Sequence, residues 1–239
     1  MNKPLGRKAY GSIAHLPSSR IGPGDHHCHA GQERICTEKA RDKHDRIIVT
    51  EKLDGSNTAI ANIDGSIVAL GRSGYRASTS PYEQHHLFAY WVQSMHAVFV
   101  DILATGDVLH GEWLAQAHGT IYKLEHMPFV AFDLSTNGIR NPWDTVVERC
   151  GRFGVPVASV LHDGGPVSLE KIKQEIEVSR HGVVPPDTVE GAVWRVERKG
   201  AFDFMAKWVR PDKVDGKYLE SVSGKPTIWN WLPPQRITA

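Results

Sequence analysis

Short apolar runs, separated by turn residues, predict strands along most of the chain. The run at 46–50 predicts one strand, and the runs at 58–61 and 67–70 predict a hairpin closed by Asp64-Gly65. Further runs of strand type lie at 110–114, 129–134, 190–193 and 204–210. Together these runs predict antiparallel sheet.

A longer segment has the spacing of a helix. We place Ser80 as its N-cap, with Pro81 in the first turn and Glu83 reaching back, and Gly106 ends it. The apolar positions at helical spacing are Leu87, Tyr90, Trp91, Met95, Val98, Phe99 and Ile102. We expect this stripe to be core and to pack on the sheet that carries Glu112.

Two shorter helices are expected later in the chain. One lies between Pro142 and Gly151, and the other runs over 169–180 behind the cap Ser168, with Ile172 and Ile176 on its buried side. With the strands, these helices indicate an α+β fold. The chain has neither an internal repeat nor a low-complexity linker, so we expect a single domain over 1–239.

The composition is typical of an enzyme domain. The chain has 239 residues, of which 41% are hydrophobic, enough to bury a substantial core. No apolar run approaches the roughly twenty residues of a membrane span, and the N-terminus lacks a signal peptide's hydrophobic stretch. Cys28, Cys36 and Cys150 are too scattered for a disulfide framework or a structural zinc site. We expect a soluble, cytoplasmic protein without membrane contact.

The formal charge is nearly balanced, at +1, so binding to nucleic acid would rest on local basic patches. The first candidate patch comprises Arg34, Lys39, Arg41, Lys43, His44 and Arg46. The second comprises Arg195, Arg198, Lys199, Lys207, Arg210, Lys213 and Lys217. Acidic residues interrupt both patches. A solvated face of mixed charge is the alternative interpretation of the first patch, whereas the second is better supported because it brackets Lys207.

Lys52-Leu53-Asp54-Gly55, directly after the first strand, is the main candidate for chemistry. A lysine in this setting suits an enzyme in which an amine attacks the α-phosphate of a nucleotide. Since the pKa of a free lysine is near 10.4, deprotonating it at neutral pH costs about 4 kcal/mol. We expect burial, neighbouring cations or a bound metal to lower the pKa of Lys52. Alone, the motif also fits an exposed lysine before a tight turn.

Residues further along the chain strengthen the first interpretation. In chain order they are Arg72 after the hairpin, Glu112 between Gly111 and Trp113, Phe129 and Phe132 in one apolar run, Glu190 before Gly191, and Lys207 beside Trp208. Each could be an ordinary core or surface residue. The order and the separations carry the signal, since Arg72 follows Lys52 by twenty residues and Phe132 follows Glu112 by twenty.

This ordered set resembles the covalent nucleotidyltransferase superfamily of polynucleotide ligases and messenger-RNA capping enzymes, and within it the second family of RNA ligases. The resemblance covers residues 8–215. It implies the nucleotidyltransferase fold, an ATP-grasp-like ligase adenylation domain in which antiparallel sheets flanked by helices hold a nucleotide pocket between them. It also implies ATP and Mg²⁺ (or Mn²⁺) as cofactors.

The implied activity is the joining of RNA 3′-hydroxyl and 5′-phosphate ends through lysyl-AMP and RNA-adenylate intermediates. RNA with such ends is the implied partner, and proteins that process or repair RNA ends are further candidates. Two alternatives stay open. One is another nucleotidyltransferase, a DNA ligase or a GTP-dependent capping enzyme, and the other is a nucleotide-binding sensor of RNA ends without turnover.

The resemblance assigns the nucleotide to five residues. Lys52 would be the nucleophile, and Glu51 with nearby backbone would read the adenine edge. Glu112 would hold the ribose hydroxyls, while Phe132 would stack on the adenine, with Phe129 as the fallback.

The resemblance assigns the phosphates and the metal to four others. Asn57 and Arg72 would contact phosphate or the incoming RNA end. Glu190 would bind the divalent cation, directly or through water, and Lys207 would neutralise the α-phosphate as charge builds in the transition state.

The last motif departs from the family pattern, which presents two lysines one residue apart. Here Lys207 occupies one position and Met205 the other. Arg210 is the candidate for the missing cation, at a different spacing. Which basic group contacts the leaving pyrophosphate stays open.

The segment Asp25-His26-His27-Cys28-His29 lies outside the family pattern. It could ligate a transition metal, contact an RNA 5′-phosphate or the triphosphate, or form local structural hydrogen bonds. Adjacent ligands on a short loop rarely all face one ion, which favours the structural role.

The residues after Asp215 are too few for the OB-fold of DNA ligases and capping enzymes or for the helical module of RNA ligases. Trp229, Trp231 and Pro233-Pro234 instead favour a tail that docks on the catalytic domain. We therefore expect no C-terminal OB-fold or helical domain.

Overall fold

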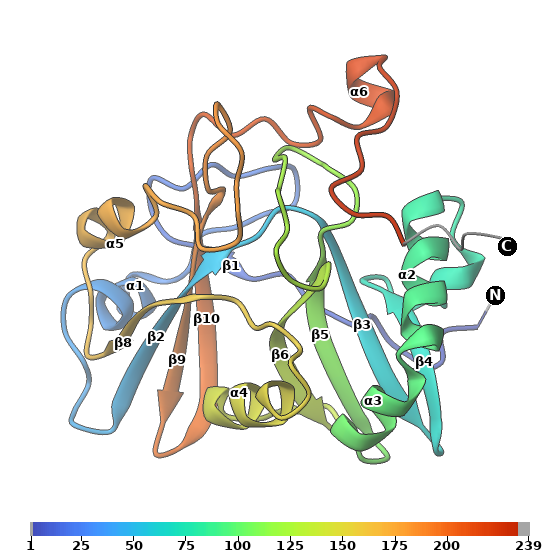
Figure 1. Ribbon diagram of the computed structural model, residues 1–239. Helices are drawn as coiled ribbons and strands as arrows, with labels where there is room; N and C mark the ends of the chain where they lie inside the picture. Colours follow the sequence, from blue (N-terminus) through green and yellow to red (C-terminus); the bar gives the residue numbers. More distant parts are fainter. Residues whose placement is uncertain (1, 234–239) are drawn as a thin grey trace, which may run out of the picture.

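Two five-stranded sheets make up the framework of the computed structural model, which describes residues 2–233 (Figure 1). The first sheet has the order β1 (Ala14–His15), β10 (Ala201–Val209), β9 (Gly191–Arg198), β2 (Asp45–Lys52), β8 (Val160–Gly164). The second has the order β4 (Ser66–Gly71), β3 (Ser56–Ile63), β5 (Asp107–Trp113), β6 (Phe129–Thr136), β7 (Ile139–Arg140). The β1–β10 pair is parallel and the other named pairs are antiparallel. The predicted α+β class with antiparallel sheets is confirmed.

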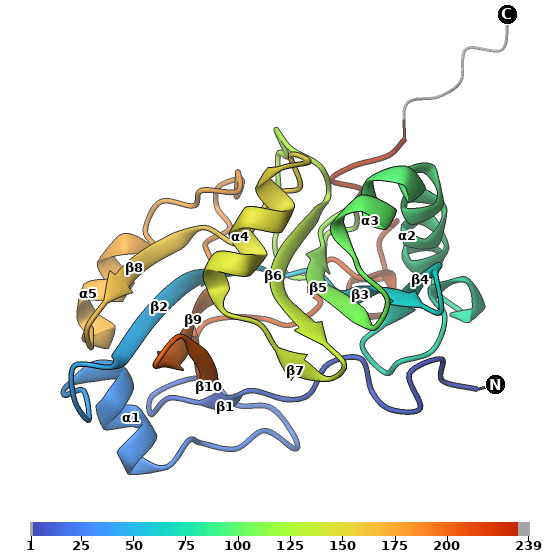
Figure 2. The ribbon, with the colours of Figure 1, turned by 90° about the horizontal axis from the view of Figure 1, so that it is seen from below.

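Helices flank both sheets. They are α1 (Ala30–Thr37), the 3₁₀ turn η1 (Ala77–Thr79), α2 (Glu83–Ser94), α3 (His96–Ile102), α4 (Trp143–Gly151), α5 (Leu169–Glu175) and α6 (Glu220–Ser223). Helices α2 and α3 pack against β4, α1 against β10, and α5 against β8. Helix α4 lies between the two sheets and packs on β6 (Figure 2). In the described part of the chain, no helix has the length and apolarity needed to cross a membrane.

Strand β2 contributes to two hydrophobic cores, and this packing fixes the side of the strand that Lys52 faces. Ile48 packs in the core shared by the two sheets, whereas Ile47 and Val49 pack in the core beneath α1 and α5. Side chains alternate along a strand, so Lys52 faces the same side as Ile48. The strand therefore points its lysine at the space between the sheets, while Glu51 points the other way.

The predicted hairpin is confirmed as β3 and β4. Ile63 pairs with Ser66 at its closed end. Asp64 and Gly65 have φ of 50° and 84°, the left-handed values that a two-residue type I′ turn requires.

The long helix predicted from Ser80 is wrong in four respects. It is divided at Met95 into α2 and α3, and it begins after Tyr82. The Ser80 hydroxyl does not cap it, because this oxygen accepts from the Tyr82 amide (3.2 Å) and bonds to His85 Nδ1 (2.6 Å). Tyr90, expected in the core, is 58% exposed. Trp91 and Phe99 are buried as predicted, in the core that includes the β5 strand of Glu112.

Helix α4 confirms the prediction between Pro142 and Gly151. Helix α5 begins after Ser168, whose side chain accepts from the Lys171 amide as expected, but it ends at Glu175 rather than at Arg180. Ser179 and the Arg180 amide instead bond to the carboxylate of Glu51, at 2.7 and 3.0 Å. These contacts with another element replace the last helical turn.

The C-terminal segment docks on the second sheet, as predicted. The Asn230 amide group donates to the Leu114 carbonyl at 2.8 Å, and the Ala117 amide donates to the Ile228 carbonyl at 3.0 Å. The ring of Trp231 lies 5.9 Å from that of Trp113. Pro234, part of the same prediction, lies outside the described residues.

Candidate active site

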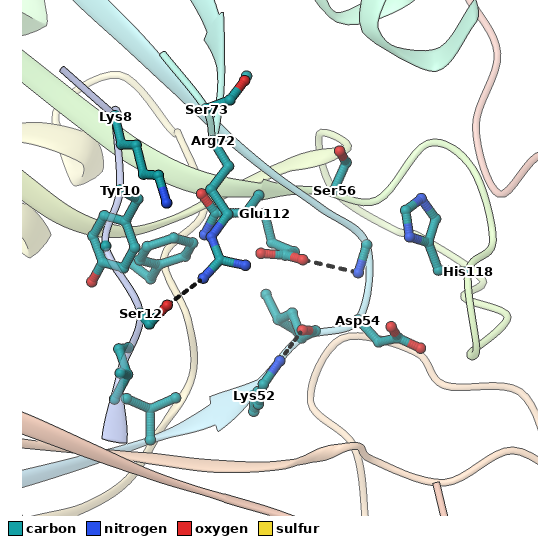
Figure 3. A pocket seen from close by; sticks show the side chains of 18 of the residues that line it. Lys8, Tyr10, Ser12, Lys52, Asp54, Ser56, Arg72, Ser73, Glu112 and His118 are labelled. Carbon is teal, nitrogen blue, oxygen red and sulfur yellow. Dashed lines mark hydrogen bonds between the residues drawn. The ribbon is translucent and has the colours of Figure 1, made fainter. Parts of the chain in front are cut away.

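A cleft of about 1080 Å³ lies between the two sheets (Figure 3). It is walled by the segment 8–13, by the end of β2 with the turn that follows, and by the connection between β4 and α2. Of the predicted site residues, it is lined by Glu51, Lys52, Asn57, Arg72, Glu112, Phe132, Glu190 and Lys207. Predicted site residues separated by as many as 156 positions, from Glu51 to Lys207, therefore meet in one cavity.

Lys52 is held as an ammonium by the carboxylate of Glu190. Its Nζ donates to Glu190 Oε2 at 2.6 Å and to the Leu53 carbonyl at 3.3 Å. Burial lowers the pKa of Lys52, but the negative charges of Glu190, Glu112 and Asp54 together raise this pKa well above its ordinary range. The expected lowering of the Lys52 pKa is therefore wrong for the protein without its ligands. Nucleophilic attack requires the Lys52–Glu190 pair to change.

Glu112 braces the turn that follows Lys52. Its Oε1 accepts from the Gly55 amide at 3.0 Å (Figure 3). Burial raises the pKa of Glu112 to about 7, and the negative charge of Glu190 adds to this effect, while Lys52 opposes it. Near neutral pH this carboxyl group is divided between its neutral and ionised forms.

We expect Glu112→Gln to stabilise the protein at pH 8. Folded Glu112 keeps its proton up to about pH 7, whereas an unfolded glutamate loses it near pH 4.5. Between these values the folded state binds more protons, so this group makes the free energy of unfolding fall as pH rises. Glutamine cannot ionise, so it removes the free-energy cost of a buried carboxylate, and its side-chain oxygen can still accept from the Gly55 amide. We therefore expect the free energy of unfolding to increase by about 1–2 kcal/mol at pH 8, and by less towards pH 5. Urea titrations at both pH values measure it, with the exposed Glu125→Gln as the matched control. An equal gain at both pH values would contradict the raised pKa.

Lys207 faces the cleft beside an acid from the N-terminal segment. It pairs in register with His15 of β1, and its Nζ lies 3.8 Å from Asp25 Oδ1. Burial lowers the pKa of Lys207, and the nearby charge of Lys52 lowers it further. Asp25 Oδ2 also lies 3.2 Å from Nε2 of His15, whose ring is 1% exposed. The position of Asp25 gives its segment a structural role next to the site.

The described residues contain no group of three or more His, Cys, Asp or Glu that could hold a metal ion alone. Magnesium and manganese commonly use one or two carboxylates together with the oxygens of substrate phosphates. The carboxylates of Glu190 and Glu112 both lie near Lys52, and the charge of each raises the pKa of that lysine. Glu190, with Glu112 nearby, therefore fits a cation that is shared with a nucleotide.

Phe132 lies in the cleft and Phe129 does not. The Phe132 ring contacts Tyr10 edge-on, with 5.2 Å between ring centroids. Phe129 is fully buried against Phe88 and Trp91. Stacking on an adenine stays a prediction. Of the two phenylalanines, only Phe132 lines the cleft where an adenine could stack.

Two other predicted residues have side chains that turn away from the cleft. Glu51 is 2% exposed, and its carboxylate is bonded to Ser179 and Arg180, so any adenine contact would fall to the backbone. Arg210 pairs with Asp212 at 3.3 Å and lines a separate hollow beside Trp208. Arg210 therefore does not replace the cation missing at Met205.

Lys213 is a site residue that sequence reasoning placed wrongly. The sequence pattern assigns it to a basic patch, yet its Nζ is paired with Asp54 in the turn after Lys52 and donates to Thr120 Oγ1 at 2.7 Å. Side-chain exposure is 6% for Lys213 and 12% for Asp54. The docked C-terminal segment thus holds the turn after Lys52. Lys213 and Asp54 are 159 positions apart, so no local sequence pattern predicts their contact.

A family model described as RNA ligase matches residues 45–209, more than half of the chain. The chain is also similar to a solved structure of an archaeal ATP-dependent RNA ligase, form 2, with a TM-score of 0.50 and 17% identity, over 84% of this chain and 48% of that one. Two mutants of Naegleria gruberi RNA ligase, one with AMP and Mn and one with ATP and Mn, each give a TM-score of 0.51. Their identities are 18% and 21%, and the matches cover 74% and 77% of this chain and 53% of theirs.

No curated protein matches the chain. At such low identities the structural likeness shows the fold alone, and it confirms the nucleotidyltransferase fold of ligases. The chain spans about half the length of the solved structures that it matches.

Proposed function

The chain belongs to the RNA ligase family, and on this premise we propose that it uses ATP to join RNA 3′-hydroxyl and 5′-phosphate ends. The observation that carries the proposal is the meeting of Lys52, Glu190 and Lys207 in one cleft at the end of β2. A protein that only binds nucleotides has no need of a lysine held in such a pocket. ATP is favoured as the nucleotide because the similar structures include an ATP-dependent ligase and ligase mutants with ATP or AMP.

In the proposed first step, Lys52 Nζ attacks the α-phosphorus of ATP. A nitrogen–phosphorus bond forms, the bond to the β-phosphate oxygen breaks, and pyrophosphate leaves in line. The ammonium must first lose a proton, and Glu190 Oε2 at 2.6 Å is the nearest acceptor. A divalent cation, Mg²⁺ or Mn²⁺, would be held by Glu190 and the substrate phosphates and would neutralise phosphate charge.

Lys207 would face the α-phosphate during this step. Burial and the charge of Lys52 lower its pKa, and phosphate binding would oppose that shift by supplying negative charge. In the second step the AMP moves from Lys52 to the RNA 5′-phosphate, which frees the lysine and forms a phosphoanhydride. In the third, the 3′-hydroxyl attacks that 5′-phosphate, a phosphodiester forms, and AMP leaves.

A nucleotide and substrate panel tests the proposal. The protein is incubated with ATP or GTP, a divalent cation, and 5′-phosphorylated strands whose 3′ ends carry either ribose or deoxyribose. We expect ligation with ATP and a ribose end. Ligation with GTP alone would indicate another nucleotidyltransferase, and equal sealing of deoxyribose ends would indicate a DNA ligase. ATP binding without any protein–AMP adduct would indicate a sensor of RNA ends.

A further inference from the structure

Ion pairs neutralise most of the second basic stretch predicted from the sequence and part of the first. In the first, Arg41 pairs with Asp45 and Asp203, and Arg46 pairs with Asp144 and Asp163. In the second, the paired cations are Arg195, Arg198, Lys207, Arg210, Lys213 and Lys217. These side chains have carboxylate partners of their own. Arg34, Lys39, Lys43 and Lys199 form no ion pair among the described residues, but none of these four lines the cleft of Lys52.

Among the residues that line the cleft, unpaired positive charge gathers at one rim. Lys8 comes from the N-terminal segment, and Arg72 and Arg76 come from the connection that follows β4. All three are exposed, and none forms an ion pair with a carboxylate in the described part of the chain. Arg72 is oriented by a 3.3 Å hydrogen bond to Ser12 Oγ, and Lys8 lies beside it (Figure 3).

Two exposed tyrosines stand among these cations. Tyr75 is 39% exposed and Tyr82 is 62% exposed, and both line the same cleft as Lys52. Lys3 Nζ lies 5.1 Å from the centre of the Tyr75 ring. Aromatic rings interleaved with unpaired cations are the pattern of surfaces that bind single-stranded nucleic acid, where bases stack on rings and cations follow the backbone.

We propose that Lys8, Arg72, Tyr75, Arg76 and Tyr82, here called the cleft rim, bind single-stranded RNA next to its 5′-phosphate. The inference rests on the proposed function, and it deepens that function by naming the substrate as an RNA end with unpaired nucleotides. Bases within a duplex are stacked on each other and cannot lie on protein rings, whereas the bases of a single strand can. The cleft rim lines the same cavity as Lys52, and at about 1080 Å³ this cavity lies just above the roughly 300–1,000 Å³ typical of one small-molecule site.

Two pairs of matched variants test the cleft rim. Tyr82→Ala is compared with Tyr90→Ala, because both tyrosines lie at or in helix α2 and are 62% and 58% exposed, but Tyr90 does not line the cleft. Arg76→Ala is compared with Arg34→Ala, since both arginines are exposed and Arg34 belongs to the patch predicted from the sequence. Binding is followed by fluorescence anisotropy with a 5′-phosphorylated single-stranded RNA labelled at its 3′ end, and with a blunt RNA duplex of the same length.

We expect Tyr82→Ala to weaken single-strand binding about tenfold, as for the loss of one stacked base, and Tyr90→Ala to leave it unchanged. Arg76→Ala should reduce the slope of log affinity against log salt by about 0.7, whereas Arg34→Ala should not. Duplex binding should be weaker than single-strand binding and insensitive to Tyr82→Ala. Equal effects within either pair of variants, equal affinity for the duplex, or no RNA binding by the wild type would overturn the proposal.

The outcome is separable from that of the proposed function, because the protein–AMP adduct forms from ATP without RNA. An adduct together with equal effects in the matched variants would refute the cleft rim and leave the ligase proposal standing. RNA binding that depends on Tyr82 and Arg76, without an adduct, would support the cleft rim and refute the ligase.

Discussion

Replacing Lys52 with alanine is expected to abolish the covalent protein–AMP adduct. The reason is that Lys52 is the amine at the centre of the cleft, with Glu190 as its 2.6 Å partner. Intact mass after incubation with ATP and Mg²⁺ measures the adduct, which should be present in the wild type and absent in Lys52→Ala. An adduct that survives the replacement would show that the nucleophile lies elsewhere.

Lys52→Arg is the matched control for this loss. Arginine keeps a cation beside Glu190, so the buried carboxylate retains a partner, but a guanidinium is not deprotonated in proteins and cannot attack phosphorus. We expect Lys52→Arg to match the stability of the wild type and to form no adduct. Because the carboxylates raise the pKa of Lys52, adduct formation by the wild type should also speed up as pH rises through neutrality.

Replacing Arg195 with methionine is expected to lower the free energy of unfolding by about 3–5 kcal/mol. Arg195 of β9 donates to Asp133 of β6 at 3.0 Å and to Glu197 at 2.7 Å, and so joins the two sheets. The three side chains are at most 3% exposed. The replacement leaves two buried carboxylates without their shared cation, and removing one partner of a buried ion pair costs far more than the net contribution of that pair.

Urea unfolding of Arg195→Met and wild type measures this effect. The control is Arg152→Ala, which breaks the pair with Glu148, where the side chains are 67% and 61% exposed. Exposed pairs contribute about 0–1 kcal/mol, so the control should unfold close to the wild type. Similar losses of unfolding free energy in both variants would mean that burial does not set the contribution of these ion pairs to stability.

Local patterns were sufficient where an element depends on its own residues. The β3–β4 hairpin was predictable because Asp64-Gly65 suits the left-handed conformation of its turn. The end of α5 was not, because Ser179 and Arg180 leave the helix to bond with Glu51, which lies well over 100 positions earlier. Likewise the exposure of Tyr90 depends on which face of α2 packs against the second sheet.

The same division holds for the candidate site. Lys52, Glu112, Glu190 and Lys207 were identifiable because each lies in or beside a short motif, and the motifs keep a characteristic order along the chain. Met205 was visible as a departure, but the failure of Arg210 to replace it depends on the folded position of its side chain, which pairs with Asp212 and lines a separate hollow.

The sequence by itself determined the family and indicated the candidate nucleophile and the order along the chain of the strands that bear the site, because these follow from local periodicity and motif spacing. Only the tertiary structure decided which charged side chains lie beside these residues. It pairs Lys52 with Glu190, Lys213 with Asp54 and Lys207 with Asp25, and within residues 2–233 it gives the cations of the cleft rim no carboxylate partner. The physical reason is that Coulomb interactions and desolvation act through distance in space, and distance in space is set by the folded sheets rather than by position along the chain.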